Sequence, residues 1–100
     1  MNITDQGLAI NARFFLVIDN LIHTRRIRGL KTFTDKYGLN YWNLWSVKNE
    51  PDKHFVRPEW LSILVTDFGV SATYLLTGVG VMFTANEEKR LRPSRAAAGK

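Results

Sequence analysis

The feature that most constrains the fold is a three-residue turn, Gly38-Leu39-Asn40, between two short helical patterns. The first pattern, Leu30 to Tyr37, stops at Gly38, the residue best able to adopt the left-handed conformation that ends a helix. Asn40 suits the start of the next helix, because its side chain can accept a hydrogen bond from the first turn. The sequence therefore predicts two short helices, Leu30–Tyr37 and Tyr41–Lys48, joined tightly. The apolar residues expected to lock them together are Phe33, Leu39 and Leu44, and Val47 is expected to face inward beside Leu44.

Three further helices are predicted from apolar residues at three- and four-residue intervals and from capping residues. They cover Asn11–Thr24, Pro58–Phe68 and Ala72–Thr77. Asn11 is the expected N-cap of the first of them, and Ser71 of the last. Only Val79–Phe83 has a strand-like composition. The predicted fold class is all-α, with five helices.

Length and charge indicate one domain followed by a tail. One hundred residues with 45% hydrophobic content are enough for a single packed core. Residues 1–83 are expected to form this domain, and residues 84–100 a basic disordered tail or the beginning of a linker. The tail holds five basic and two acidic residues, so only +2 of the formal charge of +5 belongs to residues 1–83. Net charge alone therefore does not identify a nucleic-acid binder.

Several classes of protein are excluded or disfavoured. The chain has no cysteine, which excludes disulfides, thiol catalysis and cysteine-bound zinc. Its longest apolar runs have five residues, too few to span a bilayer, so a soluble cytoplasmic protein is expected. His23 and His54 lack metal-ligand spacing, and no nucleophile–base arrangement is visible. We expect no enzyme activity, no cofactor, no metal and no membrane partner.

Two stretches resemble a known family. In Phe68–Gly78, Gly-Val-Ser is followed by Tyr-Leu-Leu-Thr-Gly, and Phe33–Asn40 resembles a motif helix with its turn. Together with the order of the helices, they closely resemble the phage-repressor-like (lambda-repressor-like) helix-turn-helix family of bacterial and phage regulators. The resemblance covers about Asn11 to Gly78. It implies a five-helix DNA-binding domain and a sequence-specific transcriptional regulator, expected to be a repressor that binds double-stranded DNA.

The resemblance also implies that a recognition helix, about Asn40–Lys48, enters the major groove. The residues it places against bases are Tyr41, Trp42, Asn43 and Ser46. Of these, only Asn43 belongs to the bidentate type that discriminates bases best. Trp42 is equally compatible with contact to DNA or to protein, whereas Trp45 is expected to pack against neighbouring helices.

Phosphate contacts are expected from two groups of polar and basic residues on either side of the turn. They comprise Arg25, Arg28, Lys31, Asn40, Lys48, Asn49, Lys53 and Arg57, with Arg26 and His54 beside them. Each of these residues taken alone is best interpreted as an ordinary solvated side chain. Two such groups flanking the Gly38-Leu39-Asn40 turn favour DNA binding. Two departures from the family stand out. Leu30 occupies the place where many members have Gln, and Lys48-Asn49-Glu50-Pro51 replaces the usual turn after the recognition helix.

Family members usually bind as symmetric dimers, so a homodimer is expected. The candidate interface is the last predicted helix together with Val79, Val81, Met82 and Phe83. The alternative is that these four residues fold back and complete the core. A second function also stays open: a protein-interaction module, such as an antitoxin or adaptor that keeps the fold without base readout. The Tyr41-Trp42-x-x-Trp45 run and the low charge of residues 1–83 favour that alternative.

Overall fold

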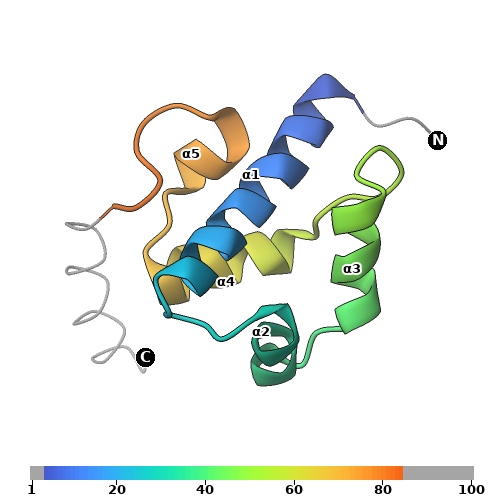
Figure 1. Cartoon of the computed structure of the whole chain (residues 1–100). Helices are drawn as coiled ribbons and strands as arrows, with labels where there is room; N and C mark the ends of the chain where they lie inside the picture. The colour runs from blue at the N-terminus through green and yellow to red at the C-terminus, as the bar shows by residue number, and fades with distance from the viewer. Residues whose placement is uncertain (1–3, 85–100) are drawn as a thin grey trace. The chain divides into compact units, whose positions relative to one another are not determined.

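The computed structural model describes residues 4–84, which hold five helices (Figure 1). They are α1 (Asp5–His23), α2 (Leu30–Tyr37), α3 (Tyr41–Asn49), α4 (Pro58–Phe68) and α5 (Ala72–Thr77). Within residues 4–84 there is no strand, only an isolated bridge between Val70 and Phe83, so the all-α fold class is confirmed. The residues of the predicted tail beyond Thr84 lie outside the described part of the chain.

The chain divides into two compact units between Val56 and Arg57. The first unit holds α1, α2 and α3, and the second holds α4 and α5. Within the first unit, α3 packs against both α1 and α2. No helix in the described part of the chain is long and apolar enough to cross a membrane.

Helix α1 begins earlier than its apolar pattern predicts. Thr4 is its N-cap, with a side-chain oxygen that accepts a hydrogen bond from the Gly7 N–H at 3.2 Å, and Asp5 lies in the first turn. Both features stabilise a helix N-terminus. The prediction that Asn11 is the N-cap is therefore wrong. Asn11 lies within α1 on its buried face, one turn before Phe14.

The end of α1 is closed by a residue other than glycine. Arg25 has φ +65° and is the only non-glycine residue with positive φ among those described. Its N–H donates to the Ile22 carbonyl at 3.0 Å, and the Arg26 N–H donates to the Leu21 carbonyl at 2.8 Å. This pair of hydrogen bonds is the Schellman pattern, in which glycine usually takes the left-handed position. Arg25 thus turns the chain sharply away from α1.

The turn between α2 and α3 agrees with the sequence prediction. Gly38 is left-handed, with φ +66°, and the Leu39 N–H donates to the Thr34 carbonyl at 2.9 Å. The Asn40 side chain caps α3 by accepting from the Asn43 N–H at 3.1 Å. Phe33, Leu44 and Val47 are buried, as predicted, whereas Leu39 is half-buried. Helix α3 extends one residue further than predicted, to Asn49.

The second unit is built on the same local signals. Pro58 occupies the first turn of α4, and Gly69 ends it in the left-handed conformation. Ser71 caps α5 by accepting from the Tyr74 N–H at 3.1 Å. After α5 the chain returns, so that the Met82 carbonyl accepts from the Ser71 N–H at 2.8 Å. The segment Val79–Phe83, whose composition is strand-like, thus forms a single β-bridge, from Phe83 to Val70, and no strand.

Candidate nucleic-acid interface

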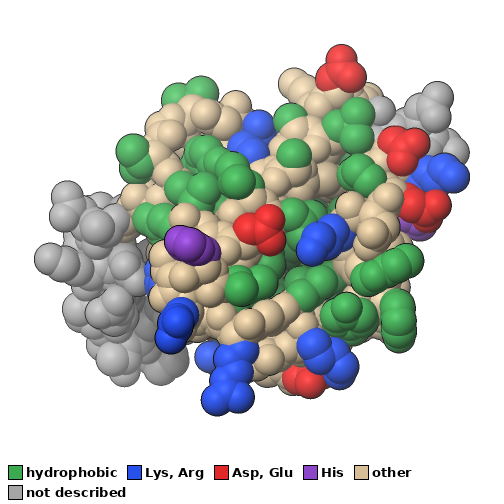
Figure 2. Space-filling model, in the orientation of Figure 1, with side chains coloured by type: hydrophobic (Ala, Val, Ile, Leu, Met, Phe, Trp, Pro, Cys, Tyr) green, Lys and Arg blue, Asp and Glu red, His purple; other side chains and the backbone are tan. Residues whose placement is uncertain are grey.

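An aromatic face on α3 is the most exposed apolar feature of the first unit. Trp42 is 65% exposed and Trp45 is 43% exposed. Tyr41, Trp42 and Trp45 form a row of edge-to-face rings, with centroids 5.2 Å and 5.8 Å apart. We call these three residues the aromatic row. Figure 2 shows hydrophobic side chains gathered over α3, with Lys and Arg side chains over α2 and the end of α1.

The aromatic row overturns the expectation for Trp45. Leu44 and Val47 take the inward positions of α3, and both are buried. Each step along a helix turns the side chain by about 100°, so Trp45 cannot share the direction of Leu44. Its ring therefore lies in solvent and against Trp42, rather than in the core. The other predicted base-contacting residues of α3, Asn43 and Ser46, are half-buried.

The first group of predicted phosphate contacts lies at the end of α1 and the start of α2. Arg25, Arg28 and Lys31 are all exposed. Lys31 forms an ion pair with Asp35, one turn along α2, with Nζ and Oδ1 2.9 Å apart. A phosphate would have to compete with this carboxylate. Arg25 and Arg28 instead border a hollow that contains no acidic residue among its described lining.

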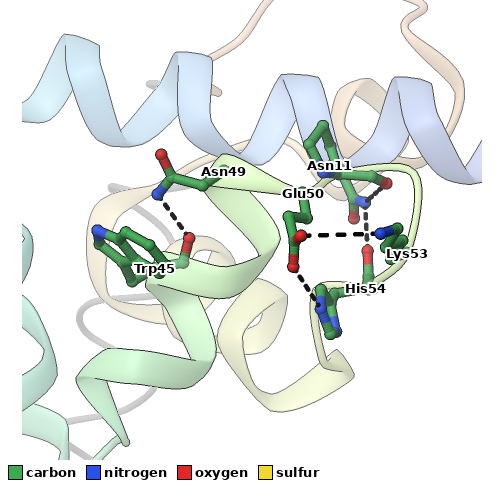
Figure 3. A network of polar contacts seen from close by, with 7 residues as sticks. Asn11, Trp45, Asn49, Glu50, Lys53 and His54 are labelled. Carbon is green, nitrogen blue, oxygen red and sulfur yellow. Dashed lines mark hydrogen bonds and ion pairs between the residues drawn. The ribbon is translucent and has the colours of Figure 1, made fainter.

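The second group follows α3 and is organised around Glu50 (Figure 3). Glu50 carboxylate oxygens lie 3.8 Å from the Lys53 Nζ and 3.4 Å from the His54 Nε2. The Asn49 side-chain amide donates to the Trp45 carbonyl, one turn earlier in α3, at 2.8 Å. Lys48 is exposed in the last turn of α3. Arg57 belongs to the second unit, where it is the residue that precedes α4.

Asn11 is a positioning residue that the sequence prediction missed (Figure 3). Its side chain is fully buried. The amide nitrogen donates to the Pro51 carbonyl at 2.9 Å and to the His54 carbonyl at 2.7 Å, and the amide oxygen accepts from the Val56 N–H at 3.0 Å. One side chain of α1 thus fixes three backbone groups of the loop after α3. Its signal in the sequence was its position on the apolar stripe, one turn before Phe14.

The four candidate dimer residues fall into two pairs. Val79 and Val81 are exposed, whereas Met82 and Phe83 are half-buried. Met82 accepts the hydrogen bond from Ser71, and Phe83 forms the bridge with Val70. The end of segment 79–83 therefore contacts the residues just before α5, while Val79 and Val81 remain exposed to solvent.

The exposed side chains of α2, α3 and the loop after α3 include the rings of Trp42 and Trp45, the amide of Asn49, several Lys side chains, the carboxylates of Asp35 and Glu50 and the imidazole of His54. Across residues 4–84, no group of three or more His, Asp or Glu side chains is arranged to hold a metal ion.

Comparisons with protein-family models, with curated proteins and with solved structures gave no match to this chain. The functional assignment therefore depends on the geometry of α2, α3 and the residues around them.

Proposed function

We propose that this chain is a sequence-specific DNA-binding transcriptional regulator, a repressor with a lambda-repressor-like helix-turn-helix, in which α3 enters the major groove. The single observation that carries the proposal is the joint between α2 and α3. A left-handed Gly38 and a capping Asn40 connect two packed helices, while the opposite side of α3 stays open to solvent. This arrangement is typical of the helix-turn-helix motif, in which the second helix projects as a probe.

Base contacts are assigned to residues in the first two turns of α3. Asn43 is suited to adenine, because its amide both donates and accepts, and Ser46 is suited to a single base edge. The hydroxyl of Tyr41 bonds either a base or a phosphate. Trp42, the most exposed ring, is suited to packing against a thymine methyl group.

Phosphate contacts are assigned to the residues around that probe. Asn40 uses its side-chain oxygen in the cap of α3, which leaves its amide N–H groups to donate to a phosphate. Arg25, Arg28 and Lys48 bring exposed positive charge. Lys31 and Lys53 contribute phosphate contacts when they leave their ion pairs with Asp35 and Glu50 and bind DNA phosphates instead.

The proposal includes a cytoplasmic homodimer on two half-sites, as is common for such proteins. The exposed Val79 and Val81 of the second unit are its candidate interface residues. Selection from randomised duplex DNA would give the operator and the half-site spacing in one experiment.

The test of the proposal compares base-reading with phosphate-binding substitutions. Asn43→Ala and Ser46→Ala are expected to relax base preference at one position each, at a cost of about 1–3 kcal/mol on the cognate site. Arg28→Ala and Lys53→Ala are expected to weaken binding to all sequences alike. Affinity for duplex should fall with salt, with a log–log slope near −4 or −5 for about five phosphate contacts. An absence of binding to any duplex at low salt would overturn the proposal.

A second function is favoured by the aromatic row. Two exposed tryptophans on one short helix are unusual for a free surface and typical of the anchors of protein interfaces. An antitoxin or adaptor would use Trp42 and Trp45 to bind a protein, with little dependence on salt. Salt dependence therefore separates the two functions, because phosphate contacts release counterions and buried rings do not.

A further inference from the structure

A hollow of about 250 Å³ opens in the first unit where α1 ends and α2 begins. Its described lining comprises Arg25, Arg26, Ile27, Arg28, Thr32, Phe33, Lys36 and Tyr37. The volume lies just below the roughly 300–1,000 Å³ of sites that take drug-sized ligands, so the hollow suits a small group.

The lining is strongly one-sided in charge. It contains four cationic side chains, and no Asp or Glu is among the described residues around it. The acidic residue of α2, Asp35, is held by Lys31, which is outside the lining. The like charges of Arg25, Arg28 and Lys36 repel one another, and an anion placed between them relieves that repulsion. The site therefore selects for negative charge.

The donor chemistry suits phosphate. Guanidinium groups present planar forks of N–H donors that match the oxygens of phosphate, and several cations around one hollow suit its multiple negative charge. Arg25 and Arg28 supply two such forks, and Lys36 supplies an ammonium group that lies 5.4 Å from the centroid of the Tyr37 ring. Thr32 adds a hydroxyl from the first turn of α2.

The left-handed conformation of Arg25 determines where the lining residues that follow it lie. Because the chain reverses at Arg25, the residues that follow leave the axis of α1 and line the hollow, rather than continuing the helix. A glycine at this position would turn the chain with less strain but without a charge.

We propose that this hollow is a phosphate-binding site in which Arg25, Arg28, Lys36 and Thr32 hold the phosphate oxygens. The phosphate belongs either to a DNA backbone or to a free phosphorylated small molecule. If the phosphate is that of a DNA backbone, the inference rests on the proposed function, which already assigns Arg25 and Arg28 to phosphates. If it belongs to a free molecule, the inference stands on the lining of the hollow alone.

The experiment is a titration of the full chain with pyrophosphate, followed by amide NMR shifts and calorimetry. We expect saturable shifts confined to residues 25–37. Arg28→Ala and Lys36→Ala are expected to weaken pyrophosphate about tenfold each, the effect of losing one charge-assisted hydrogen bond. Both residues are exposed, so neither substitution should prevent folding. Arg13→Ala is the matched control: it removes the same charge from α1, outside the hollow, and should leave pyrophosphate affinity unchanged.

A second titration, with a short duplex present, distinguishes the two sources of phosphate. Displacement of pyrophosphate by duplex assigns the site to a DNA backbone phosphate. Simultaneous binding of both assigns it to a free phosphorylated molecule. The inference is overturned if the amides of residues 25–37 do not respond to pyrophosphate, or if Arg13→Ala weakens pyrophosphate binding as much as Arg28→Ala does. Duplex binding that persists in that case leaves the proposed function standing.

Discussion

The Nζ of Lys31 lies 2.9 Å from the Oδ1 of Asp35, so a predicted phosphate-binding lysine already has an acidic partner on its own helix. Both side chains are about two-thirds exposed, at 67% and 64%. Exposed pairs of this kind contribute little to stability, on the order of 0–1 kcal/mol. The carboxylate therefore matters more as a competitor for Lys31 than as a stabilising group.

Asp35→Asn is expected to raise affinity for duplex DNA by about 1.4- to fivefold, because exposed ion pairs are worth about 0.2–1 kcal/mol. The gain should shrink as salt is raised, since salt screens exposed charges. Fluorescence-anisotropy titrations at several salt concentrations would measure both effects. Asp5→Asn makes the same charge change in the first turn of α1 and should have a smaller effect. A loss of affinity in Asp35→Asn would argue against a phosphate contact at Lys31.

Arg25→Gly is expected to stabilise the fold and weaken phosphate binding at the same time. Glycine relieves the left-handed conformation of this residue, with an expected gain of about 0.5–1 kcal/mol in the free energy of unfolding. Denaturant unfolding and pyrophosphate titration would measure the two effects. Arg28→Gly is the matched control, since Arg28 has no positive φ and its replacement should lose binding without gaining stability. An unchanged or lower stability in Arg25→Gly would contradict the strain assigned to this turn.

Asn11→Ala is expected to lower the free energy of unfolding by about 2–4 kcal/mol, because buried backbone groups of the loop lose their partners. Asn11→Asp should be at least as damaging, since an ionised carboxylate cannot donate to the Pro51 and His54 carbonyls. Asn49→Ala removes one exposed hydrogen bond and should cost about 1 kcal/mol or less. Thermal and denaturant unfolding would rank the three variants. If Asn11→Ala lowers the free energy of unfolding no more than Asn49→Ala does, the loop after α3 keeps its conformation without Asn11.

Substitutions of the buried Trp60 and the exposed Trp42 are expected to affect different properties: stability for Trp60, and partner binding for Trp42. Trp60 is 2% exposed, and Trp60→Ala is expected to cost about 3–5 kcal/mol of stability. Trp42→Ala should change stability by no more than about 0.5 kcal/mol while weakening the partner interaction. Unfolding curves give the first comparison, and acrylamide quenching of fluorescence with and without duplex gives the second. Quenching of Trp42 that duplex leaves unchanged would remove this residue from the DNA interface.

Local signals in the sequence predicted most helix boundaries. The bounds of α2 and α5 agree with the prediction because Gly38, Gly78 and Ser71 act on their immediate neighbours in the chain. Asn11 was misassigned for the opposite reason. Asparagine is a good N-cap, but here its partners are some 40 residues away along the chain, and capping preference carries no information about them.

The candidate site was predictable in part. The cluster of basic residues around Arg25–Lys31 is visible in the sequence, and so is the spacing of Lys31 and Asp35, which favours an ion pair on a helix. The prediction that Trp45 packs against neighbouring helices is wrong, because ring size alone does not tell a core residue from an exposed one. The hollow was also not predicted, because it depends on how Arg25 turns the chain.

The buried hydrogen bond from the Val56 N–H to Asn11 has a consequence for the timescale of motion. An amide in a loop ordinarily exchanges its hydrogen with solvent rapidly, whereas one held by a buried acceptor exchanges only when the structure around it opens. The Val56 amide is therefore expected to exchange as slowly as the amides inside α1. The loop after α3 is then expected to open only together with α1.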